Sequence, residues 1–321
     1  MPRDVAQTRR LAWSIGSISG VQVTRRTRSS SDVDHSPHLL MHTPEQRRAV
    51  LYLVAAAFLW SVGGLLIKWV QWHPIAIAGM RSLIAAITLW AVTPRFEWRF
   101  GRDQWIGAIL YTMTVMLFVV ANKLTTAANA IFLQYTAPIY IALFGAWFLK
   151  EHPTRLDWAL MALAQGGTAL FFLDQFQGSG FWGNVCALAS GMSFAALTLH
   201  LRRHRDASPV ASVFLGNLLT FALGCPFMFE SQPSVKGWLG LVLLGVFQLG
   251  LSYKLYTVAI RHVRALEASL IGTLEPVLNP IWVLLFLGEK PGPWAVAGGC
   301  IVIGAVSVRA VATARGAKSL G

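Results

Sequence analysis

The stretch AANAIFLQYTAPIYIALFGAWFLKEHP at residues 127–153 aligns without gaps with ALEASLIGTLEPVLNPIWVLLFLGEKP at residues 265–291. The identical pairs are Ala127 and Ala265, Ala130 and Ala268, Pro138 and Pro276, Phe148 and Phe286, Leu149 and Leu287, Glu151 and Glu289, and Pro153 and Pro291. Both stretches are long and apolar enough to cross a bilayer, which takes about 20 residues. The sequence therefore predicts two related membrane-spanning units.

The composition supports a membrane protein. The chain has 321 residues, of which 55% are apolar and 13% charged, and its mean hydropathy is +0.54. Soluble domains carry about 25% charged residues, and a single hydrophobic core stops growing near roughly 250–300 residues. This much apolar side chain excludes an ordinary soluble enzyme, a nucleic-acid binder and a disordered scaffold.

Ten apolar stretches alternate with short polar connections. Only helices satisfy the backbone of such stretches inside the hydrocarbon, so the predicted fold class is an all-α integral membrane protein with ten transmembrane helices. The predicted spans are 49–70, 74–94, 104–122, 126–149, 155–173, 180–200, 208–229, 236–258, 264–288 and 291–312.

The basic residues predict the orientation. If span 1 begins in the cytoplasm, fifteen Lys and Arg residues flank the cytoplasmic ends, against three on the other side, Lys123, Lys236 and Lys290. The fifteen are Arg47, Arg48, Arg95, Arg99, Arg102, Lys150, Arg155, Arg202, Arg203, Arg205, Arg261, Arg264, Arg309, Arg315 and Lys318. This positive-inside bias places both termini in the cytoplasm and the chain in the inner or plasma membrane.

The repeat predicts two units, 49–174 and 180–312, with five spans each. Because five is odd, the units cross the membrane in opposite senses, an arrangement that recurs in secondary transporters. The polar residues 1–48 are predicted to be a disordered tail, with two alternatives: translation that starts at Met41, or a targeting segment. Residues 313–321 form a second cytoplasmic tail.

The sequence also resembles the EamA family of the drug/metabolite transporter superfamily. The resemblance rests on AAFLWSVGGLLIKW with Trp60 and Lys68, on HPIAIAGMRSLIAA with Arg81, and on the two repeated stretches quoted above. It implies a ten-helix inner-membrane carrier, often an exporter of amino acids or related metabolites. It also implies that spans 1–4 and 6–9 surround the substrate cavity, while spans 5 and 10 support them.

Glu275 is the clearest candidate site residue, since a charged side chain at membrane depth costs roughly 2.5–3.5 kcal/mol even on the gentler scales. Helical spacing places it on one face with Asn279 and Trp282. Pro276 and Pro280 free backbone carbonyls one turn earlier. Glu275 is predicted to bind a substrate amine or carry a coupling proton; the alternative is that it satisfies backbone groups loosened by the prolines.

Other candidates lie in the first half of the chain. Arg81, about two turns inside span 2, is predicted to receive a substrate carboxylate, with snorkelling to the surface as the alternative. Gln134 and Tyr135 precede Pro138 in span 4, where they mirror the region of Glu275. Trp60 is a candidate for an aromatic cavity wall. Pro138, Pro276 and Pro280 are candidate gating or helix-break positions.

The predicted function is alternating-access transport of a small amphoteric metabolite, most simply an amino acid, in the direction of export. A sugar-phosphate or nucleotide-sugar exchanger and an assembly protein remain as alternatives. No cofactor, metal or nucleic acid is expected, because no HExxH motif occurs and the three cysteines are scattered through apolar runs. The expected partners are the substrate and the bilayer, with protons as a candidate coupling ion and a homodimer left open.

Overall fold

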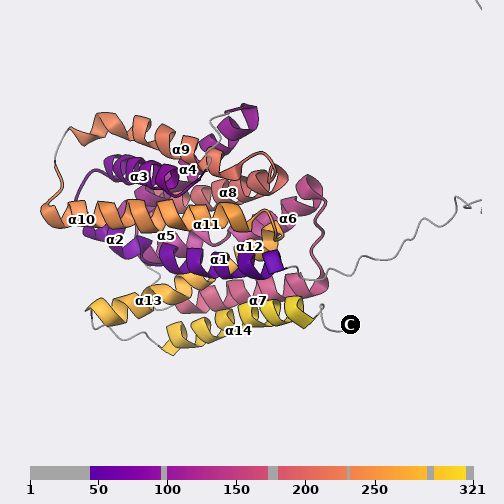
Figure 1. Cartoon of the computed structure of the whole chain (residues 1–321). Coiled ribbons are helices and arrows are strands. Elements are labelled where there is room, and N and C mark those ends of the chain that lie inside the picture. Colours follow the sequence, from indigo (N-terminus) through magenta and orange to yellow (C-terminus); the bar gives the residue numbers. More distant parts are fainter. Residues whose placement is uncertain (1–43, 95–99, 173–179, 230–231, 288–292, 316–321) are drawn as a thin grey trace, which may run out of the picture. The chain divides into compact units, whose positions relative to one another are not determined.

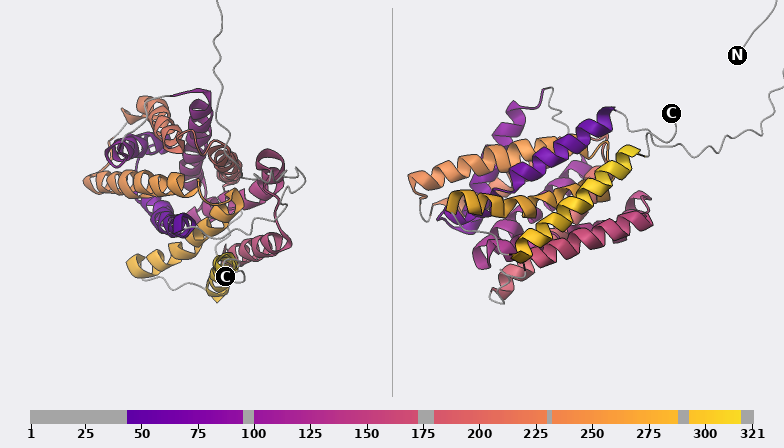
Figure 2. Two further views of the ribbon diagram at one scale, coloured as in Figure 1. Left: turned by 45° about the vertical axis from the view of Figure 1, so that its right-hand side comes forward. Right: turned by 90° about the horizontal axis from the view of Figure 1, so that it is seen from below.

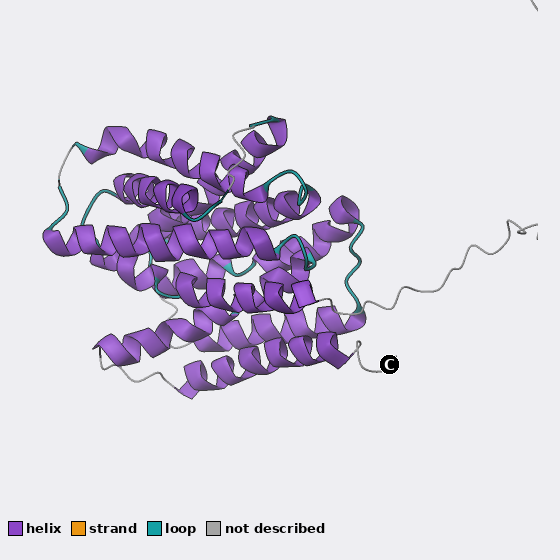
Figure 3. Cartoon of the chain, in the orientation of Figure 1, coloured by secondary structure: helices purple, strands orange, loops and turns teal. Residues whose placement is uncertain are grey.

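The computed structural model describes residues 44–94, 100–172, 180–229, 232–287 and 293–315. Within these ranges all regular secondary structure is helical (Figure 3). The predictions for residues 1–43 and 316–321, and for Glu289, lie outside the described residues.

The helices of the two halves follow the predicted ranges. The first half contains α1 (Pro44–Trp60), α2 (Gly63–Trp69), α3 (Pro74–Ala91), α4 (Arg102–Leu124), α5 (Ala127–Gln134), α6 (Ala137–Leu149) and α7 (Arg155–Phe172). The second contains α8 (Phe181–Arg203), α9 (Pro209–Gly224), the 3₁₀ turn η1 (Cys225–Met228), α10 (Val235–Leu243), the π-helix η2 (Leu244–Leu251), α11 (Ser252–Ala259), α12 (Ala265–Gly272), α13 (Leu274–Leu287) and α14 (Pro293–Arg315).

Seven helical segments of the described chain are long and apolar enough to cross a membrane. The segments in the predicted spans 155–173, 264–288 and 291–312 are not among them. Arg155, Asp157 and Gln165 make α7 more polar. The predicted span 264–288 is divided into α12 and α13, and the apolar part of α14 is short.

Helices from the two halves of the chain pack against each other. The long α4 contacts α8 and α9, α3 contacts α9 and η2, and α7 lies along α14. Figures 1 and 2 show the α7–α14 pair side by side, next to α13. Among the described residues, those that line a common interior come from α1, α3, α4, α5, α6, α8, η2, α11, α12 and α13.

Close approach of α3 to η2 depends on a glycine. A methyl group on Gly245 would lie 2.5 Å from the Cβ of Ile84 and 2.8 Å from the carbonyl oxygen of Arg81. Small residues allow such contacts between helices in membranes. The same contact sets Arg81, on α3, against the residues of η2.

Gly245→Ala is therefore expected to destabilise the fold by roughly 1–3 kcal/mol, the usual penalty for overpacking. Thermal unfolding of the purified protein in detergent measures the loss. Gly166→Ala is the matched control, because no heavy atom lies within 4 Å of a methyl group at that helical position. Equal melting temperatures for the two variants would contradict the packing argument.

Candidate functional site

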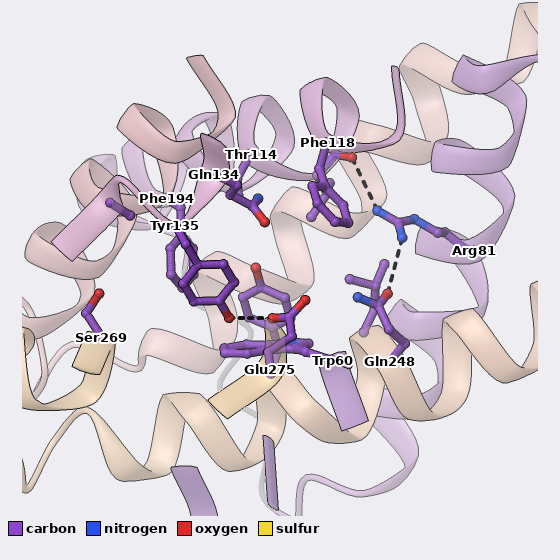
Figure 4. Close-up of a pocket in the computed structure, with 14 residues that line it drawn as sticks. Trp60, Arg81, Thr114, Phe118, Gln134, Tyr135, Phe194, Gln248, Ser269 and Glu275 are labelled. Atoms are coloured by element: carbon purple, nitrogen blue, oxygen red, sulfur yellow. Dashed lines mark hydrogen bonds between the residues drawn. The ribbon is translucent and has the colours of Figure 1, made fainter. Parts of the chain in front are cut away.

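A cavity of about 40 Å³ lies between the two halves of the chain (Figure 4). A single buried water needs roughly 10–15 Å³ of such cavity volume. The cavity in this conformation therefore has room for a few waters and is too small for an amino acid. Its lining residues are Trp60, Arg81, Thr114, Val115, Phe118, Gln134, Tyr135, Ala137, Phe194, Gln248, Leu249, Tyr253, Ser269 and Glu275.

Glu275 and Tyr135 join the two broken helices at the cavity. The Tyr135 hydroxyl donates to Glu275 Oε2 at 2.6 Å and also lies 2.8 Å from the carbonyl oxygen of Gly272. Pro276 has no N–H for the carbonyl one turn earlier, and that carbonyl belongs to Gly272. The tyrosine hydroxyl of the first half therefore lies within hydrogen-bond distance of both the glutamate and the carbonyl that the proline of the second half leaves without its helical partner.

The break between α5 and α6 has the same origin. Pro138 occupies the repeat position of Pro276 and stands at the start of α6. The carbonyl of Tyr135, at the break, accepts a hydrogen bond from Gln165 Nε2 on α7 at 2.7 Å. Both halves thus interrupt the equivalent helix at the same position of the repeat, and side chains from other helices pair with the exposed backbone.

Arg81 lies deep in the structure, with 1% of its surface exposed. Its Nη1 donates to Gln248 Oε1 at 3.2 Å and its Nη2 to the carbonyl of Val115 at 3.2 Å, while Nε has no partner. None of the ion pairs found in the described residues includes Arg81. A buried cation with only neutral partners leaves its positive charge uncompensated, and its chemistry suits an anionic group.

Gln248 was not predicted from the sequence. It lies in the middle of the π-helix η2, and such segments occur frequently at functional sites. A methyl group on Gly63, at the start of α2, would lie 2.9 Å from Gln248 Nε2, so the glutamine side chain packs closely against that turn. The one available signal was a lone amide in the apolar run LVLLGVFQLGL (241–251).

The remaining walls are polar on one side and aromatic on the other. Gln134 Nε2 donates to Ser190 Oγ at 2.8 Å, and Ser190 Oγ donates to the carbonyl of Thr114 at 2.8 Å. Trp60 contacts the rings of Phe194 and Tyr253 edge-on. The buried indole N–H of Trp60 has no hydrogen-bond partner, so the cavity holds a second donor available to a ligand.

The structure brings five of the six predicted substrate residues together: Trp60, Arg81, Gln134, Tyr135 and Glu275 all line the cavity. The side chains of Asn279 and Pro280 lie outside the described part of the structure. Pro138 and Pro276 are buried at the helix breaks but do not line the cavity. Thr114, Phe194 and Ser269 line it without having been predicted.

Two sequence interpretations need correction. Trp282 lies in the same helix as Glu275, seven residues further on, but it lines a separate apolar groove rather than the cavity, and its indole N–H donates to Ser61 Oγ at 2.7 Å. Span 7 was expected to border the cavity, yet α9 contributes no lining residue. Instead α9 packs behind α3 and α4, and its Asn217 accepts a hydrogen bond from Tyr111.

Charged side chains gather at one end of the helices. Glu151 pairs with Arg202 at 2.9 Å and accepts a hydrogen bond from the backbone N–H of Ala265 at 3.0 Å. Nearby, the buried Asp157 pairs with Arg309 at 2.6 Å and with Arg264 at 3.2 Å. These contacts fasten α7, α8 and α14 to the segment that begins α12.

The described residues contain no group of three His, Cys, Asp or Glu side chains that could hold a metal ion. The cavity therefore has to be interpreted from its arginine, its carboxyl group, its amides and its aromatic rings.

Comparison with known proteins identifies the family. Residues 47–173 and 181–309 each match the EamA-like transporter family. The chain belongs to this family. It is a multi-pass membrane transporter rather than an enzyme, and its two EamA domains account for the internal repeat.

Several curated EamA relatives align over most of the chain. An uncharacterized transporter, YxxF of Bacillus subtilis, is 22% identical and aligns over 79% of this chain and 86% of its own length. The pseudopaline exporter CntI of Pseudomonas aeruginosa is 26% identical over 80% of this chain and 94% of its own. The threonine/homoserine exporter RhtA of Escherichia coli is 22% identical over 68% and 75%.

A solved crystal structure has the same fold. It superposes with a TM-score of 0.70 and 21% sequence identity, and the match covers 83% of this EamA chain and 98% of the solved chain.

Proposed function

We propose that this EamA transporter exports an amino acid or a related amphoteric solute across the cytoplasmic membrane. The observation that carries the proposal is that Arg81 and Glu275 both line one cavity, each with less than a tenth of its surface exposed. A zwitterion offers a carboxylate to the arginine and an ammonium group to the glutamate. Such a ligand compensates both buried charges at once.

The cavity chemistry favours this solute over a sugar phosphate. Arg81 is the single Lys or Arg among the described lining residues. A dianionic phosphate is usually held by several basic side chains, and here it would also face the carboxyl group of Glu275. The exporters RhtA and CntI support the amphoteric class by analogy, since their names describe amino acids and pseudopaline as cargo.

Ten spans in two inverted five-helix units, residues 49–174 and 180–312, would give the protein two related conformations open to opposite sides. The contracted cavity supports this mechanism, because a solute larger than a few waters requires the surrounding helices to move apart. Both termini would lie in the cytoplasm. The helix breaks at Pro138 and Pro276 are the proposed positions of movement.

The Tyr135–Glu275 contact also supports protons as the coupling ion. The tyrosine hydroxyl has one proton and two acceptors within reach, Glu275 Oε2 and the Gly272 carbonyl. When Glu275 carries a proton, it donates to the tyrosine oxygen, and the tyrosine donates to Gly272. The single tyrosine proton therefore pairs with the ionised carboxylate in one protonation state of Glu275 and with the Gly272 carbonyl in the other.

The deciding experiment is counterflow in proteoliposomes loaded with one unlabelled amino acid at a time. Accumulation of the matching labelled amino acid above that of empty liposomes supports the proposal. Accumulation of hexose phosphate, with none of the twenty amino acids exchanged by protein shown to be folded, would replace it with the exchanger alternative. The same vesicles serve for every variant described below.

The ion pairs around Glu151 would close the cytoplasmic side. Glu151→Gln removes the charge opposite Arg202 and is expected to open that side more often. A cysteine introduced by Ser269→Cys, in a background without the three native cysteines, reports access to the cavity. Membrane-impermeant thiol reagents added from the cytoplasmic side should label it several-fold faster in the Glu151→Gln variant.

Asp206→Asn is the control for this measurement, since Asp206 pairs with Arg205 at the surface with 89% of its side chain exposed. Solvent-exposed ion pairs contribute about 0–1 kcal/mol to stability. An equal rise in labelling for both variants would show that loss of any nearby negative charge is sufficient, and the closure by Glu151 would be rejected.

A further inference from the structure

Arg81 and Gln248 form a contact whose chemistry is unusual for a buried arginine. The guanidinium pairs with an amide oxygen and a backbone carbonyl, both of them neutral, and its Nε remains without a partner. A carboxylate partner would add the attraction of opposite charges and a second, parallel N–H···O bond, neither of which an amide or a backbone carbonyl supplies. The present partners therefore leave the arginine short of the interaction it makes best.

Gln248 occupies the place of a carboxylate without carrying its charge. Its Oε1 accepts from Arg81 Nη1 as one carboxylate oxygen would. Gly63 lies against the amide nitrogen, and the hydroxyl of Ser252 donates to the backbone carbonyl of Gln248, which fixes the residue within η2. The Gln248 side chain thus holds the guanidinium group of Arg81 in position. The backbone of Gln248 belongs to a π-helix, whose hydrogen-bond pattern differs from that of the α-helices around it.

We propose that Gln248 is a displaceable substitute for the substrate carboxylate and so determines specificity at the Arg81 subsite. A carboxylate entering the cavity replaces the amide oxygen because it brings the missing charge. An uncharged group in the same place, such as a carboxamide, gains nothing over Gln248 itself. The inference rests on the proposed function and adds to it the residue that distinguishes acids from their neutral analogues.

The two glutamines of the cavity provide the test, because both line it but only Gln248 bonds to Arg81. Gln248→Glu places a permanent counterion on the arginine, whereas Gln134→Glu places the same charge beside Ser190. The probes are glycine, threonine and phenylalanine, each paired with its carboxamide. Binding is measured by thermal stabilisation of the purified protein, and transport by counterflow.

The wild-type protein is expected to prefer the amino acid that binds best over its carboxamide by roughly tenfold or more. Gln248→Glu should abolish or invert this preference, and Gln134→Glu should retain its direction. The inference is overturned if Gln248→Glu keeps the wild-type preference, or if both variants lose it equally.

A measurement without ligand separates this inference from the proposed function. Because Gln248→Glu supplies the buried arginine with a counterion, its melting temperature should exceed that of Gln134→Glu. Equal melting temperatures would overturn the inference even when amino-acid counterflow is present. Absence of counterflow in the wild type, together with the expected order of melting temperatures, would reject amino-acid export and leave Arg81 as an anion subsite.

Discussion

Glu275→Gln is expected to reduce both counterflow and gradient-driven export to the level of empty vesicles. Glutamine keeps the shape of glutamate and can still hydrogen bond to Tyr135, so the helix break at Pro276 should persist. It lacks the charge that would hold a substrate ammonium group, and it cannot take up or release a proton. Flux measurements in proteoliposomes, with and without an imposed pH gradient, record both losses.

The two assays separate the two roles of Glu275. Counterflow exchanges solute without net movement of protons, so a carboxyl group that only carries protons is dispensable for it. Counterflow at the wild-type rate, with loss of gradient-driven export alone, would reject the ammonium role and leave the proton role.

Glu267→Gln is the matched control for Glu275→Gln. Glu267 is also a buried carboxyl group, with 7% exposed, and it lies in α12, the helix just before α13. It does not line the cavity. Flux in this variant should remain near the wild-type value, and a loss as large as that of Glu275→Gln would point to a general effect of buried negative charge.

The repeat made the depth of Glu275 predictable. Pro138 and Pro276 occupy equivalent positions in two apolar stretches, and a proline inside such a stretch interrupts the helical hydrogen bonds. The sequence therefore indicated both the helix breaks and the charged residue beside one of them. The five predicted residues that line one cavity are all polar or aromatic residues inside predicted spans.

The contact between Arg81 and Gln248 could not be predicted in the same way. The two residues are 167 positions apart and lie in different halves of the chain. Their meeting depends on the π-helix η2 and on the close approach of Gly245 to α3, which are properties of tertiary packing. Trp282 does not reach the cavity although it shares α13 with Glu275, because it lies two turns further along that helix, beside the apolar groove.

Arg81→Gln is expected to lower the counterflow rate by about a hundredfold or more, because truncation of one partner in a buried charged contact costs roughly 2–5 kcal/mol. Arg81→Lys should also lose most of the flux, since an ammonium group cannot bond to a carboxylate in the bidentate geometry of a guanidinium. Arg155→Gln, at an exposed arginine on α7, is the control and should leave the rate unchanged.

Stability distinguishes a binding role for Arg81 from a structural one. The guanidinium is buried without a counterion, so replacing it with a neutral amide removes a desolvation cost, and replacement of buried charge by neutral groups is often neutral or stabilising. Arg81→Gln should therefore melt at or above the wild-type temperature while it fails to transport. A fall in melting temperature that parallels the fall in flux would assign Arg81 to the framework of the protein, and its position beside the cavity would then follow from packing alone.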